Sequence, residues 1–213
     1  MKREQILCFG DSNTYGLVPG TTDRYSADVR WTGRLEGKLK TYGYRVSEEG
    51  LCGRTTIFED PLREGRRGVS LLPTILETHS PLKMVVLMLG TNDCKTVYDA
   101  SAEVIGKGIK RLIEQIRKAD NAIEILVVSP IFLGKNVGEE GYDTEFDAAS
   151  EERSQKLPKV YKKVAEEAGC FFLAASDYAK PSEADREHLD EIGHAALAEA
   201  IFNTINERLN KAY

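Results

Sequence analysis

The sequence predicts an α/β domain in which helices cover a five-stranded parallel sheet. Short apolar runs occur five times along the chain, and helical patterns separate most of them. The third and fourth runs, Met-Val-Val-Leu-Met-Leu at 84–89 and Ile-Leu-Val-Val at 125–128, are almost uninterrupted. Such runs are typical of strands buried on both faces, as in parallel sheets with right-handed crossovers. With 213 residues and no evident linker, the chain is expected to form a single domain over 1–213.

The elements follow from these patterns. The strands are expected at residues 5–9, 44–48, 84–89, 124–129 and 170–173. Helical periodicity covers residues 30–41, 102–119, 151–168 and 189–209. The first helix carries Trp31, Leu35 and Leu39 at four-residue spacing, and Pro158 in the third predicts a kink or a restart. All the apolar helix faces are assigned to the core.

Three stretches are predicted to be irregular: 19–29, 61–72 and 132–150. Loops longer than about 12–15 residues are usually functional or disordered. We therefore expect the first and third stretches to form walls over a site or contacts between subunits. The second stretch carries Arg63, Arg66 and Arg67, which suit a solvated basic patch as well as a role in binding substrate or a neighbouring molecule.

Composition excludes several classes of protein. The net charge of −5 argues against a general nucleic-acid binder. No apolar run approaches the roughly 18 residues that span a bilayer, and no signal-peptide pattern is present. The four cysteines are widely spaced and form no metal-type cluster, and Cys8 and Cys170 read as buried apolar residues. These features predict a cytoplasmic protein without a metal, nucleic acid or membrane as partner.

Polar motifs follow the predicted strands. Gly10-Asp-Ser12 ends the first strand, Gly53 lies shortly after the second, and Gly90-Thr-Asn92 ends the third. Asp185-Arg-Glu-His188 lies beyond the fifth. Ligands of open parallel sheets bind at the carboxyl ends of the strands, so these remote motifs are expected to converge on one site.

The motifs supply the groups that acyl transfer needs. A serine hydroxyl requires an adjacent base, and His188 follows Asp185 by three positions. This spacing lets the carboxylate hold one ring nitrogen while the other faces Ser12. The other two histidines are given lesser roles: His194 is expected on a helix surface, with the site as the alternative, and His79 on the surface or in a loop.

An oxyanion would need fixed donors. The backbone N–H of Ser12, the N–H of Gly53 and the Asn92 carboxamide are the candidates, although Asn92 equally suits a turn or helix cap. Asp11 is interpreted as an acceptor that fixes the turn, and Asp93 as a cap or loop anchor. The chain has no Gly-x-Ser-x-Gly elbow, phosphate loop or His-Glu-x-x-His motif, so the α/β-hydrolase, nucleotide and metal interpretations lack support.

These motifs resemble those of a known family of enzymes. The chain resembles the SGNH (GDSL-like) hydrolases, which are esterases and lipases with a three-layer, flavodoxin-like α/β/α sandwich. Their four blocks are matched by Gly10-Asp-Ser12-Asn, Gly53, Gly90-Thr-Asn92-Asp and Asp185-x-x-His188. The resemblance implies Ser12 as nucleophile, His188 as base, Asp185 as its partner, and Ser12, Gly53 and Asn92 as the oxyanion hole. It implies no cofactor.

A closer resemblance is to the bacterial arylesterase/acyltransferase branch, carried by residues 30–33, 48–51, 54–56, 88–93 and 127–130. It implies cleavage of short acyl and aryl esters, acyl transfer to alcohols and homo-oligomers. The chain departs from the family pattern at Asn13, where Leu is usual. Arg186-Glu187 also replaces the small and apolar residues usual between Asp and His, and these charges are expected to change the pH profile or to select polar substrates. Segment 131–150 matches the branch poorly.

We therefore predict a serine esterase for short-chain acyl esters. The alternative is a carbohydrate O-deacetylase with a polar cleft around Arg63, Arg66 and Glu187. A more remote alternative, a non-catalytic binding module, would need a broken Ser–His–Asp set. An aryl esterase would instead have a narrow apolar cleft around Trp31, Ile131 and Phe132. The residues expected to contact substrate are these three and Asp11.

Overall fold

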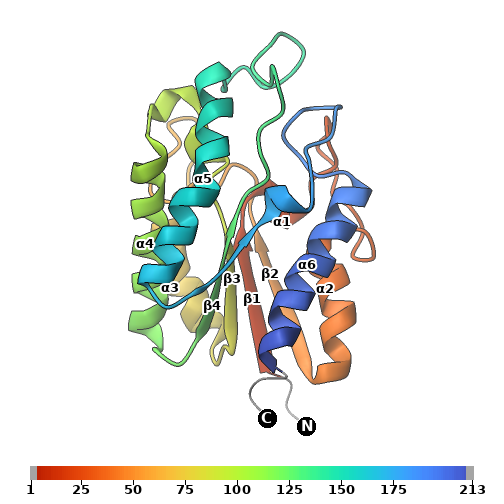
Figure 1. Cartoon of the computed structure of the whole chain (residues 1–213), viewed down its shortest axis with the longest axis vertical. Helices are drawn as coiled ribbons and strands as arrows, with labels where there is room; N and C mark the ends of the chain where they lie inside the picture. Colours follow the sequence, from red (N-terminus) through yellow and green to blue (C-terminus); the bar gives the residue numbers. More distant parts are fainter. Residues whose placement is uncertain (1–3, 210–213) are drawn as a thin grey trace.

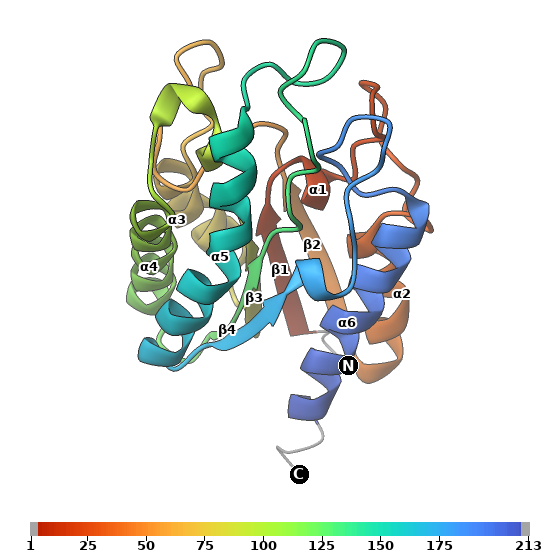
Figure 2. The same cartoon turned by 45° about the horizontal axis from the view of Figure 1, so that its top comes forward.

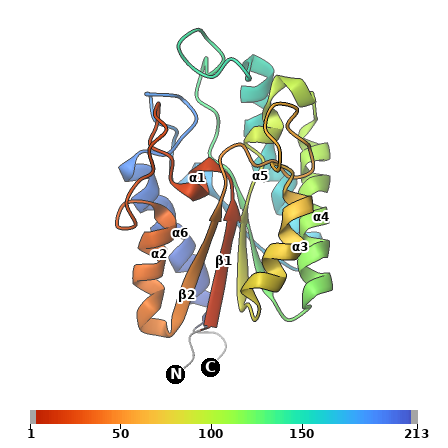
Figure 3. The same ribbon diagram turned by 180° about the vertical axis from the view of Figure 1, so that it is seen from behind.

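The computed structural model describes residues 4–209 and contains one parallel sheet of five strands. The strands are β1 (Glu4–Gly10), β2 (Tyr44–Gly50), β3 (Met84–Met88), β4 (Glu124–Ser129) and β5 (Phe171–Ala174). Their order in the sheet is β2-β1-β3-β4-β5, with β2 at one edge beside β1 (Figure 3). This is the flavodoxin-like order, in which the direction of winding reverses between β1 and β3.

Helices cover both faces of the sheet. They are α1 (Ser12–Tyr15), α2 (Trp31–Leu39), α3 (Gly68–His79), α4 (Ala102–Ala119), α5 (Ala148–Glu167) and α6 (Glu191–Leu209). Helices α3, α4 and α5 lie on one face and α2 and α6 on the other (Figure 1). Side chains of β1 alternate between the two cores, with Leu7 and Phe9 in the first and Ile6 and Cys8 in the second. The predicted α/β/α class is confirmed.

Most element boundaries agree with the sequence analysis to within a few residues. Helix α4 has the predicted bounds, and Ser101 caps it by accepting a hydrogen bond from the Val104 N–H at 3.3 Å. Helix α5 begins earlier than expected because Asp147 and Ser150 form a capping box. It continues through Pro158 without a restart.

Helix α3 corrects the predicted loop 61–72, which ends before Gly68. Pro73 lies inside this helix and has no N–H to give to the carbonyl of Val69, four residues earlier. The side chain of Gln115 on α4 replaces the missing donor, with its Nε2 2.7 Å from that oxygen. The helix therefore tolerates its proline through a residue that is distant in sequence.

The irregular segments gather at the carboxyl end of the sheet. Figure 2 shows the loops that follow β1 (red), β4 (green) and β5 (blue) at this end. All four cysteines are free: Cys8 and Cys94 are buried, whereas Cys52 and Cys170 are half-buried, so Cys170 is less enclosed than predicted. Among the helices of residues 4–209, none combines the length and apolar character needed to cross a bilayer.

Candidate active site

Ser12, His188 and Asp185 form one hydrogen-bonded chain. The Oγ atom of Ser12 lies 2.8 Å from Nε2 of His188, and Nδ1 of His188 lies 2.8 Å from Oδ2 of Asp185. Ser12 is the first residue of α1, separated from β1 only by Asp11, and the other two residues lie in the loop between β5 and α6. Ser12 and His188, which are 176 positions apart in the sequence, thus meet at the switch point of the sheet, where this type of fold binds ligands.

The loop that carries His188 is shaped by Asp185. One carboxylate oxygen, Oδ1, accepts hydrogen bonds from the backbone N–H groups of Glu187 (3.0 Å) and His188 (2.9 Å). The other, Oδ2, accepts from the N–H of Gly20 at 2.9 Å as well as from the imidazole. A single side chain therefore folds its own turn, orients the ring and anchors loop 19–29.

The serine turn is fixed by its neighbours on the chain. Asp11 accepts a hydrogen bond from the Asn13 N–H at 3.0 Å, which caps α1 as expected from the sequence. A side chain at Gly10 would clash, because a Cβ there would lie 2.0 Å from Oγ1 of Thr14. Ser12 itself is only 3% exposed.

Asn13 connects the serine turn to the histidine loop. Its Oδ1 accepts from the Leu189 N–H at 2.9 Å, and its Nδ2 donates to the Glu187 carbonyl at 3.4 Å. The leucine usual at this position in the family motif has no polar atoms for these bonds. The departure from Leu is visible in the sequence, but its role depends on contacts between residues far apart in the chain.

Electrostatics favour a charged Asp185 and a strongly basic His188. Burial raises the pKa of Asp185, but the hydrogen bond and charge of His188 outweigh it and bring the pKa to about 2. Burial lowers the pKa of His188, but the carboxylates of Glu187 and Asp185 outweigh this and raise the pKa to about 9. When the imidazole is neutral, the bond from Nδ1–H to Asp185 leaves Nε2 free to accept the serine proton.

The expected oxyanion donors come from neighbouring loops. Asn92 follows β3, and its Nδ2 donates to the Arg54 carbonyl at 3.2 Å, which joins it to the loop that contains Gly53. Gly53 has a φ of 82°, a conformation that favours glycine. Asp93 anchors the same loop by accepting from the Thr56 N–H at 3.0 Å. Asn92 and Gly53 are thus held in adjacent segments at the carboxyl end of the sheet.

Arg54 is a supporting residue that was not predicted from the sequence. It is 3% exposed, its guanidinium donates to the Gly10 carbonyl at 2.9 Å, and it lies 4.2 Å from the centre of the Phe9 ring. Burial lowers its pKa to about 10. Arg54 therefore ties the loop after β2 to the end of β1, just before Ser12.

The residues expected to contact substrate are mostly enclosed. Trp31 is 0% exposed and its indole N–H donates to the Asn13 carbonyl at 3.0 Å, so it supports the serine turn from inside the core. Asp11 is also 0% exposed. Neither side chain has accessible surface in this structure, so their assignment to substrate contact loses support. Ile131 is 3% exposed, and Phe132 is half-buried.

The other two histidines differ from expectation. His194 is 0% exposed rather than on a helix surface, because the start of α6 packs against α2. Its Nδ1 accepts from the Trp31 N–H at 3.3 Å, and burial lowers its pKa to about 4. His79 ends α3, half-buried between Gln5 and Glu49, to which its ring nitrogens are hydrogen-bonded at 3.1 and 2.8 Å.

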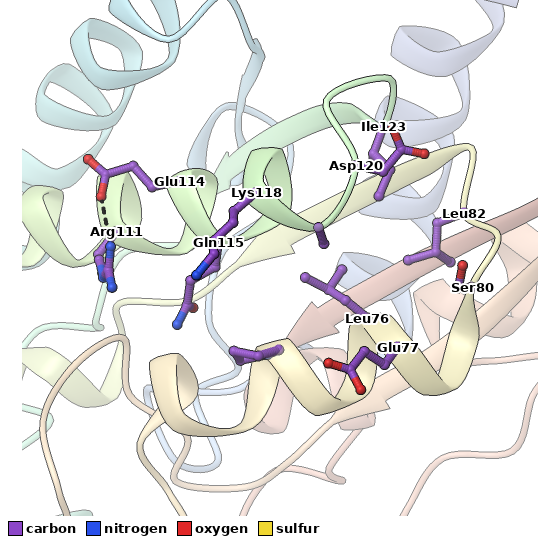
Figure 4. Close-up of a pocket in the computed structure, with 12 residues that line it drawn as sticks. Leu76, Glu77, Ser80, Leu82, Arg111, Glu114, Gln115, Lys118, Asp120 and Ile123 are labelled. Atoms are coloured by element: carbon purple, nitrogen blue, oxygen red, sulfur yellow. Dashed lines mark hydrogen bonds and ion pairs between the residues drawn. The ribbon is translucent and has the colours of Figure 1, made fainter.

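A separate cavity of about 440 Å³ lies between α3 and α4 (Figure 4). Leu82 and Ile123 in its wall precede β3 and β4, so it lies at the end of the sheet opposite Ser12. It contains none of the predicted site residues. Within residues 4–209, no group of three or more His, Cys, Asp or Glu side chains is arranged to hold a metal ion.

Comparisons with known proteins identify the family of the chain. Residues 8–196 match the model of the GDSL-like lipase/acylhydrolase family, and the chain belongs to this family. Est24, a carbohydrate acetylesterase from Sinorhizobium meliloti, is 32% identical, with 96% of this chain and 99% of that chain covered and a TM-score of 0.91. The M. smegmatis aryl esterase is 33% identical over 96% and 99% of the two chains, with a TM-score of 0.90.

A third solved structure, a putative arylesterase from Agrobacterium tumefaciens, is 34% identical over 96% of this chain and 99% of its own, with a TM-score of 0.84. A comparison with curated proteins gives no significant match. The predicted SGNH hydrolase family and the predicted class, a serine ester hydrolase, are confirmed.

Proposed function

We propose that the chain hydrolyses short-chain acyl esters, with Ser12 as nucleophile, His188 as general base and acid, and Asp185 as the group that orients His188. One observation carries this proposal: the two 2.8 Å hydrogen bonds that join the three side chains in series. A serine is activated when its hydroxyl contacts a base that a third group orients. The remote alternative, a non-catalytic binding module, would not need this intact series.

The reaction proceeds in two halves. Ser12 Oγ attacks the ester carbonyl while its proton passes to Nε2 of His188, and Asp185 stabilises the imidazolium. When the tetrahedral intermediate collapses, the bond to the alcohol oxygen breaks and that oxygen takes the proton from Nε2. Water then attacks the acyl-enzyme by the same route and releases the carboxylic acid. An alcohol in place of water gives acyl transfer.

The oxyanion formed in each half requires donors that are already in place. We assign this role to the Ser12 N–H, the Gly53 N–H and the Asn92 carboxamide. The bond from Asn92 to the Arg54 carbonyl uses one amide hydrogen and leaves the other for the oxyanion. The positive φ of Gly53 supports the assignment, because it turns the backbone in a way that a larger residue disfavours.

Two substrate classes agree with the relatives. The M. smegmatis protein is named an aryl esterase, and Est24 is named a carbohydrate acetylesterase. Burial of Trp31 and Ile131 weakens the expected apolar cleft for aryl groups. The Glu187 carboxylate, 3.7 Å from Nε2 of His188, favours a polar alcohol portion. Acyl transfer, a homo-oligomer and a cytoplasmic location stay predictions.

Replacing the nucleophile tests the proposal. Ser12→Ala should abolish turnover of p-nitrophenyl acetate, and a fluorophosphonate should label Ser12 in the wild type but not in the variant. Ser70→Ala, at an exposed serine on α3, is the matched control and should keep both properties. Retained turnover in a folded Ser12→Ala protein would contradict the assignment.

A further inference from the structure

Glu187 places a second carboxylate beside the reacting pair. Its Oε1 atom lies 3.7 Å from Nε2 of His188, the same nitrogen that lies 2.8 Å from Ser12 Oγ. The Glu187 side chain is only 7% exposed. In the proposed ester hydrolysis, the Glu187 carboxylate neither transfers a proton nor contacts the oxyanion.

The carboxylate of Glu187 lacks a hydrogen-bond donor. Its backbone is engaged on both sides, with its N–H bonded to Asp185 and its carbonyl to Asn13. Within residues 4–209, however, no N–H or O–H group donates to either side-chain oxygen. The Glu187 oxygens are not among the buried side-chain atoms without a partner, so they keep some accessible surface and can accept a hydrogen bond from a molecule in the site.

The charged surroundings do not supply that partner. Asp143 and Asp185 oppose the charge of Glu187, while His188 and Lys95 favour it. Lys95 is already paired with Glu145, its Nζ lying 2.5 Å from that carboxylate. Burial raises the pKa of Glu187 to about 7, as expected for a carboxyl group without hydrogen-bond donors.

The position of this acceptor is tied to the chemistry. The alcohol oxygen of the ester must come within hydrogen-bonding reach of Nε2, because it takes its proton from that atom. Glu187 therefore lies beside the alcohol portion of the substrate and not beside the acyl group. A hydroxyl on the carbon next to the ester-bearing carbon would lie close to Oε1 of Glu187.

We propose that Glu187 is a specificity-determining residue that accepts a hydrogen bond from a hydroxyl group vicinal to the ester. The preferred substrates are then acyl esters of diols, polyols or sugars that retain a free neighbouring hydroxyl. Phenyl esters have no such group. This inference rests on the proposed function, because it uses the proton transfer from Nε2 to locate the alcohol.

Two small esters isolate the predicted contact. 2-Hydroxyethyl acetate and 2-methoxyethyl acetate differ at the neighbouring oxygen, and only the first can donate a hydrogen bond. Wild-type protein should prefer the first by about tenfold or more in kcat/KM, the range expected for a hydrogen bond to a charged group. The ratio does not depend on the fraction of folded protein, so a partly unfolded variant still gives a valid result.

Variants of Glu187 should change this ratio. Glu187→Met removes the acceptor at similar side-chain length and should reduce the preference to less than about twofold. Glu187→Gln keeps an uncharged acceptor, so its preference should lie between those of the wild type and Glu187→Met. Glu183→Gln, at an exposed carboxylate of the same loop, should keep the wild-type ratio. Equal ratios in the wild type and Glu187→Met would overturn the proposal.

The remaining outcomes are distinguishable. Fluorophosphonate labelling of Ser12 together with equal turnover of both esters would reject the role of Glu187 and leave the esterase intact. No labelling and no turnover would reject the proposed function and this inference with it. A third comparison uses acetylcholine and its neutral analogue 3,3-dimethylbutyl acetate. If the wild type prefers acetylcholine and Glu187→Met abolishes that preference, Glu187 recognises a cation and not a hydroxyl, which would overturn the assignment.

Discussion

Nδ1 of His194 accepts a hydrogen bond from the backbone N–H of Trp31 at 3.3 Å and so joins the first turns of α6 and α2. Trp31 in turn donates its indole N–H to the Asn13 carbonyl at 3.0 Å. The ring of His194 also lies 5.3 Å from the ring of Tyr25, in an edge arrangement. A neutral histidine thus helps hold the helices beneath the serine turn.

The buried state of His194 predicts acid sensitivity. Burial lowers its folded-state pKa to about 4, whereas an unfolded imidazole titrates near 6.5. The unfolded chain therefore binds more protons between these values, and stability falls as the pH is lowered through this window. His194→Asn keeps an acceptor near Nδ1 but does not titrate. Between pH 7 and pH 5 the wild type should lose about 2 kcal/mol more unfolding free energy than the variant.

Urea unfolding at several pH values measures this difference. The comparison isolates His194, since the other titrating groups are shared by the two proteins. Stability curves that stay parallel from pH 7 to pH 5 would contradict the prediction.

The charge on Glu187 should shape the pH dependence of turnover. His188 must be neutral to act as a base, and the carboxylates of Glu187, Asp185 and Asp11 all raise its pKa, which reaches about 9. Activity should therefore rise with pH towards this value. Glu187→Gln removes one negative charge, lowers the pKa of His188 and moves the acid limb to lower pH.

The profile of kcat/KM for phenyl acetate from pH 5 to pH 10 measures the shift. Glu183→Gln should superimpose on the wild type, because Glu183 is exposed on the same loop. An unshifted limb in Glu187→Gln would show that its charge does not act on the base.

Asp185→Asn should lower kcat by about two to four orders of magnitude. An amide nitrogen facing Nδ1 would favour the tautomer with the proton on Nε2, which cannot accept the serine proton. Asp177→Asn, at an exposed aspartate, is the control for charge alone and should keep full activity. Turnover of p-nitrophenyl acetate by Asp185→Asn at the wild-type rate would exclude an orienting role.

Asn92→Ala should lower kcat by about 10²–10³-fold with a much smaller change in KM, the usual result of losing one oxyanion donor. Its second effect, loss of the bond to the Arg54 carbonyl, is measured separately as thermal stability. Asn121→Ala, at an exposed residue between α4 and β4, serves as the control. A fall in stability without a fall in kcat would make Asn92 a structural residue only.

The pairing of Gln115 with the Val69 carbonyl can be tested by a double-mutant cycle. Gln115→Met removes the donor and should lower the unfolding free energy by about 1–2 kcal/mol in the native background. In a Pro73→Ala background the loss should be smaller, because the alanine would provide a backbone N–H to the same oxygen. Additive effects of the two substitutions in urea unfolding would contradict the compensation.

Local patterns explain why much of the fold could be predicted. The five strands were predicted because each contains a short apolar run, which is almost continuous in β3 and β4. Ser12 was proposed because Gly10-Asp-Ser12 ends the first strand, and Asp185 and His188 because Asp-x-x-His lies in the loop beyond the fifth. Helix α3 was missed because Pro73 interrupts it and the compensating Gln115 lies on another helix. The apolar spacing of Val69, Leu72 and Leu76 was the signal available for it.

The errors around the site have the same origin. The helical pattern of α6 leaves open which face is buried at its first turn, and that face is decided by contact with α2. His194 was therefore placed on the surface. The position of Glu187 beside Nε2 of His188 likewise depends on a turn in which Asp185 accepts hydrogen bonds from the backbone N–H groups of Glu187 and His188.

The nucleophile follows the first strand and its base precedes the last helix. Because 176 positions and the four strands β2–β5 separate Ser12 from His188, a nascent chain would gain the catalytic pair only after the whole sheet has been synthesised. If Ser12 and His188 act as proposed, a truncated product that ends between β5 and Asp185 would be inert even with its sheet assembled.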